Sequence, residues 1–205
     1  MQTAAALFAA SGYAATSTRQ IAERVGLRQA SLFHHFGHKD EILAELLDRT
    51  VRPALAFARW LGTQQVSPAA GLYALSWWDT HNLCANPDNL GALQLLPESR
   101  NPRFSPFWEN RAGLRGRYAA FLARLIPSPA EAGAPAELLT DLVFGLVESV
   151  LTWFDRAAAT TPEEVADAVA SGCLGLAGLD HGAIVSAISD GVALVEAFAS
   201  EEGPG

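Results

Sequence analysis

Apolar residues recur at helical spacing along nearly the whole chain, in segments that glycine and proline separate. Strand-like alternation bounded by turns is absent from the sequence. The predicted helices cover 4–10, 17–25, 28–36, 39–61, 68–85, 90–96, 105–125, 136–158, 162–177 and 183–200. Pro53 predicts a kink or a division within 39–61, because proline removes a helical hydrogen bond. The pattern therefore predicts an all-α protein.

The charge of the chain is unevenly distributed. Half of the 205 residues are hydrophobic and 18% are charged. This hydrophobic content is enough to form a buried core in one or two domains. The net charge of -8 opposes nucleic-acid binding, yet residues 17–39 hold four basic residues and one acidic residue. Because a surface field is local over about 8–10 Å, this basic segment can still approach phosphates.

Residues 18–36 have the spacing of a helix-turn-helix. Ala22 is small where two helices cross, and Gly26 can take the positive φ of a tight turn four residues later. The apolar residues expected in the shared core are Ile21, Val25, Leu27 and Leu32. Arg28, Gln29 and Ser31 are then left on the outer face of the second helix. Spacing alone fits two structures, a helix that enters the DNA major groove or a plain helical hairpin with a solvated face.

The N-terminal quarter of the chain resembles a known family of regulators. The segments that carry the resemblance are LFAASGYAATSTRQIAERVGL at 7–27, SLFHHF at 31–36 and KDEIL at 39–43. They are similar to the N-terminal module of TetR-family transcriptional regulators over about residues 4–48. The resemblance implies an all-α homodimer with a three-helix DNA-binding head, expected over 1–45. It also implies a body, expected over 46–205, that dimerises and holds a small-molecule pocket.

The resemblance assigns roles to individual residues of the head. Thr16 or Ser17 matches the cap of the second helix, where a hydroxyl meets a DNA phosphate. Arg28 and Gln29 are expected to contact bases, with Ser31 beside them on the recognition helix. His34, His35 and Lys39 match backbone-contacting positions. Arg28 stands where serine is common in the family and Gln29 where lysine is common, so the operator sequence stays open.

Two further sets of residues are expected in the body. The segments 136–158 and 162–177 have broad apolar faces or small residues, and two such helices per subunit would form an isologous four-helix interface. Small residues can equally serve close packing inside one subunit. The dimer-interface prediction comprises Leu139, Leu142, Leu146, Val150, Trp153, Gly172 and Gly175. Polar groups among aromatic residues indicate a ligand pocket, predicted to be lined by Trp60, Trp77, His81, Arg111, Tyr118, Glu148 and Thr152.

The expected function is that of a cytoplasmic repressor, released from a palindromic operator by a small-molecule inducer. A regulator that binds DNA without an inducer and a helical enzyme are the alternatives. The sequence lacks a G-x-S-x-G elbow, a P-loop and a zinc signature, so catalysis is not expected. His34, His35 and His38 are interrupted by Gly37, and we expect neither a metal site nor a cofactor. No uninterrupted apolar run reaches the ~18 residues of a membrane span, so no membrane partner is expected.

Overall fold

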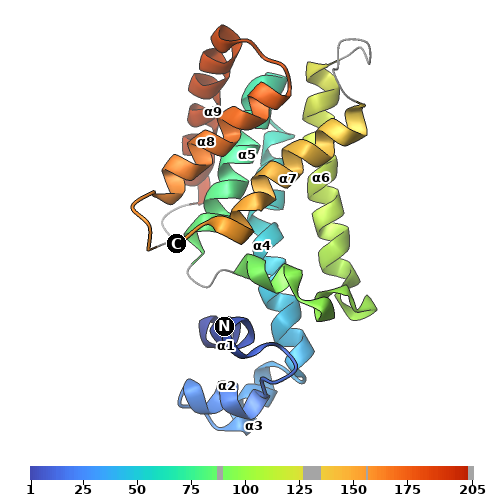
Figure 1. Ribbon diagram of the computed structural model, residues 1–205, viewed down its shortest axis with the longest axis vertical. Helices are drawn as coiled ribbons and strands as arrows, with labels where there is room; N and C mark the ends of the chain where they lie inside the picture. Colours follow the sequence, from blue (N-terminus) through green and yellow to red (C-terminus); the bar gives the residue numbers. More distant parts are fainter. Residues whose placement is uncertain (87–89, 127–134, 156, 203–205) are drawn as a thin grey trace. The chain divides into compact units, whose positions relative to one another are not determined.

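The computed structural model describes residues 1–86, 90–126, 135–155 and 157–202. Within these ranges every regular element is helical, which confirms the all-α prediction (Figure 1). The α-helices are α1 Gln2–Ser11, α2 Thr18–Arg24, α3 Gln29–His35, α4 Lys39–Leu61, α5 Pro68–Ala85, α6 Ser105–Leu125, α7 Ala136–Trp153, α8 Pro162–Leu176 and α9 His181–Glu202. Three short 3₁₀ helices are η1 Leu90–Leu95, η2 Pro97–Arg100 and η3 Pro102–Phe104.

The predicted division of the helix at Pro53 is wrong, because α4 continues through that residue, while the alternative of a kink stays a prediction. Proline lacks the N–H that would bond to the carbonyl of Arg49, and this loss destabilises a helix interior. The side chains of Leu47 and Val51 before the proline and of Phe57 after it are all buried. Their burial outweighs one missing hydrogen bond. The helix predicted over 90–96 is the 3₁₀ helix η1 instead.

The first of two compact units contains residues 1–52 and 86–110. In this unit α1 contacts both α2 and η1, and α2 contacts α3. Phe8 of α1, Ile21 of α2 and Leu43 of α4 are buried. The unit that contains the predicted head therefore also includes residues 86–110, which the sequence assigned to the body.

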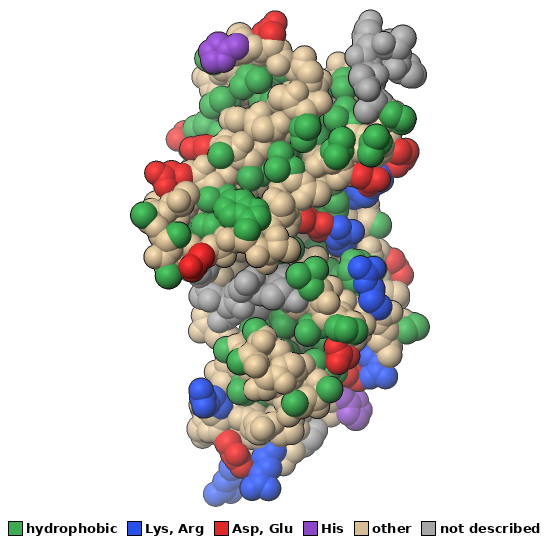
Figure 2. Space-filling model, in the orientation of Figure 1, with side chains coloured by type: hydrophobic (Ala, Val, Ile, Leu, Met, Phe, Trp, Pro, Cys, Tyr) green, Lys and Arg blue, Asp and Glu red, His purple; other side chains and the backbone are tan. Residues whose placement is uncertain are grey.

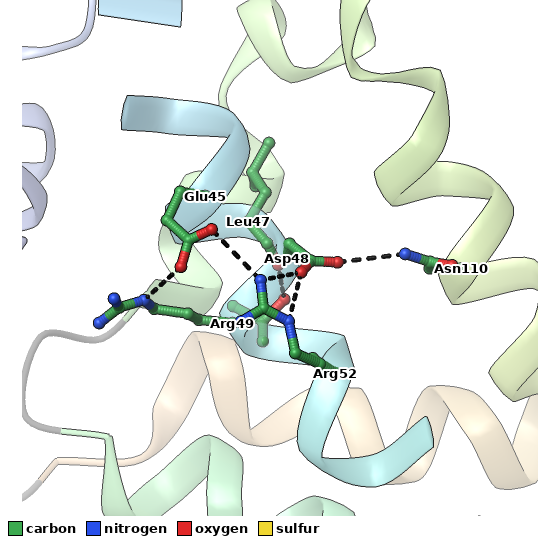
Figure 3. A network of polar contacts seen from close by, with 7 residues as sticks. Glu45, Leu47, Asp48, Arg49, Arg52 and Asn110 are labelled. Carbon is green, nitrogen blue, oxygen red and sulfur yellow. Dashed lines mark hydrogen bonds and ion pairs between the residues drawn. The ribbon is translucent and has the colours of Figure 1, made fainter. Parts of the chain in front are cut away.

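Helix α4 carries ion pairs along its own surface, and one of their carboxylates links it to α6 within this first unit (Figure 3). Glu45 accepts from Arg49 at 3.0 Å and lies 3.2 Å from Arg52, which also pairs with Asp48. The Asn110 amide donates to the second oxygen of Asp48 at 3.1 Å. The arginines are about half exposed, so these pairs position side chains more than they stabilise the fold.

The second compact unit contains residues 53–85 and 111–205. Helix α5 packs against α7, α8 and α9 (Figure 1). Gly191 of α9 allows the closest approach, since a Cβ there would lie 2.5 Å from the Tyr73 ring of α5. Gly71 likewise allows a close approach to Phe121, because a Cβ at Gly71 would lie 2.2 Å from the Phe121 ring. Glycine at both positions lets large aromatic side chains fill the core around α5.

Helix α9 is long and apolar enough to cross a membrane by length and composition alone, with a mean hydropathy of 1.5. The sequence expectation considered only uninterrupted runs, which Asp190 and Glu196 break. This is weak evidence for a span, because core helices of soluble proteins pass the same test. Among the described residues it is the one such helix, and 22% of its window is buried.

Candidate nucleic-acid interface

Ser17 fixes the start of α2. Its Oγ accepts from the backbone N–H of Gln20 at 3.2 Å, and the Gln20 side chain accepts from the backbone N–H of Ser17 at 2.7 Å. This reciprocal pair is a capping box, which satisfies two helix-end donors and defines where the helix begins. Ser17 is exposed, so the capped N-terminal end of α2 faces solvent.

Thr16 does not share this position. It is 2% exposed, and its hydroxyl donates to the carbonyls of Gly12 at 2.9 Å and Leu7 at 3.2 Å. A hydroxyl that is buried and already bonded cannot also reach a DNA phosphate. Of the two cap candidates, the structure therefore places Ser17 at the surface and Thr16 in the core of the head.

The turn between α2 and α3 depends on Gly26, which has a φ of +71°. The backbone N–H of Leu27 closes the turn by donating to the Ala22 carbonyl at 2.9 Å. Ile21 and Ala22 are buried as predicted, but Val25 and Leu27 are 41% and 48% exposed. The core prediction was wrong for these two residues, because the helix ends at Val25 and the turn carries both outward. The predicted core side chain of Leu32 lies outside the described residues.

Helix α3 presents the polar face that the sequence predicted. Arg28 directly precedes the helix and its carbonyl accepts from the Ser31 N–H at 2.9 Å. The predicted contact residues Arg28, Gln29, Ser31, His34 and His35 are all exposed. The Gln29 amide donates to the Thr18 hydroxyl at 3.2 Å, which holds the start of α3 against α2. Helices α2 and α3 form one end of the first unit, and Figure 2 shows Lys and Arg side chains there.

Lys39 has a structural task that sequence reasoning missed. Its ammonium nitrogen donates to the carbonyls of Tyr13 at 2.7 Å and Thr16 at 2.8 Å. An ammonium group has three N–H donors, so two are committed inside the head. Lys39 thereby ties the start of α4 to the loop between α1 and α2, and one donor remains for the predicted phosphate contact.

Tyr13 and Asp40 extend this connection. The Tyr13 hydroxyl donates to the Asp40 carboxylate, which also pairs with Arg103 of η3. Burial raises the pKa of Tyr13, so its hydroxyl remains a donor. The sequence pointed to Tyr13 because it lies in the segment that resembles the family. Nothing in the sequence linked Tyr13 to Arg103, which lies far along the chain.

A helix-turn-helix with these exposed polar residues is the geometry of a DNA-binding head, and comparisons with known proteins agree. The sequence model of bacterial regulatory proteins of the tetR family matches residues 1–46. The chain is 47% identical over 47 residues to the HTH-type transcriptional repressor KstR2 of Mycobacterium tuberculosis. That match covers 23% of this chain and 24% of the repressor, less than a quarter of either protein.

The crystal structure of AmtR from Mycobacterium smegmatis extends the comparison to the body. It is 43% identical to this chain, covers 91% of each chain and gives a TM-score of 0.76. The chain belongs to the TetR family of bacterial regulatory proteins. The TetR-family regulator PfmR from Thermus thermophilus is 25% identical, with a TM-score of 0.73 over 85% of this chain and 96% of that one. The family consists of soluble transcriptional regulators rather than enzymes, and its members typically bind DNA operators as dimers.

Three of the seven residues predicted to line a ligand pocket lie close together in the second unit of this TetR-family regulator. Arg111 of α6 forms a bidentate ion pair with Glu148 of α7, with its Nε 2.6 Å from one carboxylate oxygen. Tyr118, farther along α6, is fully buried and donates to Asp79 of α5 at 2.9 Å. Both members of the ion pair act electrostatically on Asp79. Asp79 was not predicted, although an acidic residue in so apolar a helix was a signal.

The other four predicted pocket residues lie elsewhere in the second unit. Trp60 stacks on Phe57, Trp77 donates to Asp167 of α8 at 2.6 Å, and His81 lies 3.1 Å from Glu163. Thr152 is exposed and donates to a carbonyl of its own helix. An open cleft of about 380 Å³ in this unit is lined by none of the seven; its walls are Cys84, Ala85, Phe154, Ala158, Ala159, Thr160, Thr161 and Pro162.

The predicted dimer residues divide between the two faces of α7 and α8. Leu139 and Val150 are 6% and 3% exposed, so the expectation that they face a second subunit is wrong. Helical spacing turns both toward the core of their own chain, with Val143 and Val147. Leu146 contacts Gly172 within the chain, where a Cβ on the glycine would lie 3.2 Å from a leucine methyl. Leu142, Trp153 and Gly175 are exposed.

Proposed function

We propose that this TetR-family regulator is a homodimeric repressor that binds palindromic double-stranded DNA and releases it when a small molecule binds the body. The observation that carries the proposal is the exposed polar face of α3, set beside a capped α2 in a head that matches the family. We place this activity in the cytoplasm, with no membrane partner and no cofactor.

DNA recognition follows from the side chains on that face. Arg28 and Gln29 can each make two hydrogen bonds to a purine edge in the major groove. Ser31, His34 and His35 offer further donors along the same helix, and the N-terminal end of α2 favours a phosphate. Two heads related by a two-fold axis would read half-sites about 34–36 Å apart, one turn of the duplex.

A dimer surface is supported by apolar side chains that the chain leaves uncovered on α7 and α8. Leu138, Leu142 and Trp153 of α7 are 48%, 46% and 54% exposed, and Leu176 of α8 is 43% exposed. Figure 2 shows hydrophobic side chains over these two helices. An exposed apolar face of this kind is typical of protein interfaces, and a two-fold axis would bring the same face of two copies together.

Release by a small molecule is a population shift in this proposal. A ligand that binds one arrangement of the dimer more tightly than the DNA-bound arrangement lowers operator affinity by that difference. The polar groups inside the second unit support such a site, because buried polar side chains are costly unless they bind something.

The test is fluorescence polarisation of the full chain with duplexes from the DNA that flanks its own gene. We expect one palindromic site to bind at least a hundredfold more tightly than random duplex. A panel of metabolites then screens for release of that site. Equal affinity for flanking and random DNA contradicts the proposal, and operator binding that no metabolite releases favours a regulator without an inducer.

A further inference from the structure

One face of α5 buries three polar side chains in the second unit. Ser76, Asp79 and Thr80 stand at i, i+3 and i+4, and their exposed fractions are 0%, 2% and 0%. Thr80 Oγ1 has no hydrogen-bond partner among the described residues, and Ser76 Oγ has none there but the Cys173 thiol. A buried hydroxyl that lacks its full set of partners destabilises the fold, so two of them on one face indicate that a hydrogen-bonding group belongs there.

The charges around this face do not balance. Asp79 accepts one hydrogen bond from Tyr118, and the Cys173 thiol of α8 lies beside Ser76. Arg111 is the cation that acts on Asp79, but its guanidinium is held by both oxygens of Glu148. Two carboxylates and one guanidinium leave a formal charge of -1. Burial, which removes the carboxylate from water, raises the pKa of Asp79 to about 7, against the hydrogen bond from Tyr118.

We propose that Ser76, Asp79 and Thr80 bind the protonated amino group of a small primary amine, which is the effector of this regulator. A primary ammonium has three N–H donors, no acceptor and one positive charge. The α5 face offers a carboxylate and two buried hydroxyl oxygens that can accept hydrogen bonds, and it lacks one positive charge. An anion is repelled by Asp79 and Glu148, and an alcohol leaves the charge unbalanced. This inference rests on the proposed function only in naming the bound amine as the releasing effector.

The Arg111–Glu148 pair is the most exposed part of the cluster, with side-chain exposures of 28% and 20%. Helix α5 contacts α7, α8 and α9, so a group bound on the inner face of α5 affects how these helices pack. A small amine at this position can therefore bias the arrangement of the body, as the proposed release requires.

The test uses the purified full chain with n-butylamine, n-butanol and butyrate as probes of equal chain length. We expect n-butylamine to raise the melting temperature in a saturable way, and the other two to leave it unchanged. Binding must also tighten about tenfold between pH 6 and pH 8, because the proton on Asp79 competes with the amine. Stabilisation by n-butanol as well, or by none of the three probes, overturns the inference. The charge of Asp79 is then neutralised by a proton and not by an amine.

Three variants locate the effect. D79N keeps an acceptor for Tyr118 but removes the charge, and it must abolish stabilisation by n-butylamine. The S76A/T80V double variant must weaken binding at least tenfold. T140V is the matched control, because Thr140 is equally buried but donates to a backbone carbonyl, and it must bind n-butylamine normally. Stabilisation that persists in folded D79N overturns the inference.

A parallel operator-binding measurement separates the two proposals. Operator binding without any n-butylamine effect refutes the amine site alone. An n-butylamine effect that D79N abolishes, in a chain that binds no flanking DNA, supports the site and refutes the repressor function.

Discussion

The ammonium nitrogen of Lys39 lies 4.1 Å from the centre of the Tyr13 ring and 2.7 Å from the Tyr13 carbonyl oxygen. One lysine thus makes a cation–π contact and two hydrogen bonds, which span 26 and 23 residues of sequence. The position that the family resemblance assigned to a DNA phosphate is therefore also a support for the loop that leads into α2.

Replacing Lys39 with methionine should lower the stability of the head as well as its DNA affinity. Two carbonyls lose a charged donor, which costs about 1–3 kcal/mol. We expect faster hydrogen exchange in α1 and α2 and weaker binding to operator and random duplex alike. A variant of unchanged stability that binds DNA more weakly would show that the phosphate contact is the whole role of Lys39.

Removing the cap of α2 should affect the head in a graded way. Ser17→Ala deletes the acceptor for the Gln20 N–H and is expected to cost about 1 kcal/mol. The matched control is Thr161→Ala, which opens the equivalent capping box of α8 in the second unit. Both variants should lower the melting temperature, but only Ser17→Ala should reduce operator affinity. Equal operator affinity for the two variants contradicts a role for the α2 terminus.

Base recognition should depend on Gln29. Gln29→Ala is expected to cost about 1–3 kcal/mol on the operator and to relax the preference at one base pair, while binding to random duplex stays the same. A selection from randomised duplexes measures that preference. Arg124→Ala, which removes a body arginine, serves as the control and should change neither quantity. Equal losses on operator and random DNA would mean that Gln29 contacts no base edge.

The dimer surface should be sensitive to charge on its exposed face. Leu142→Asp buries a carboxylate in the proposed interface and should yield monomers, as measured by light scattering at micromolar concentration. Leu95→Asp places the same charge at an exposed apolar residue of η1 in the first unit, 64% accessible, and should leave the dimer intact. A dimeric Leu142→Asp variant would move the interface away from α7.

Stability should fall as the pH rises toward neutrality, because Asp79 is protonated more readily in the folded chain. Its pKa rises from 3.8 to about 7 through burial, so the folded state holds a proton that the unfolded state has released. The free energy of unfolding should drop by up to about 1.4 kcal/mol per pH unit between these values and then level off. Asp79→Asn should lack this dependence and be the more stable protein at about pH 8. Denaturant titrations at several pH values measure it; a variant less stable than the parent at that pH contradicts the assignment.

Local signals in the sequence determined much of this protein. Helical spacing defined the α-helices to within a few residues, Gly26 marked the turn, and the segments around it identified the family. These features depend on backbone preferences and on contacts a few residues apart, which a sequence displays directly. Tertiary structure decided which of two adjacent hydroxyls, Thr16 or Ser17, is buried. It also decided that Leu139 faces inward while Leu138 faces out, because α7 is apolar on both sides and its orientation depends on what packs against it. The buried group of Ser76, Asp79 and Tyr118 likewise depends on α5 and α6 meeting, which spacing along one chain does not specify.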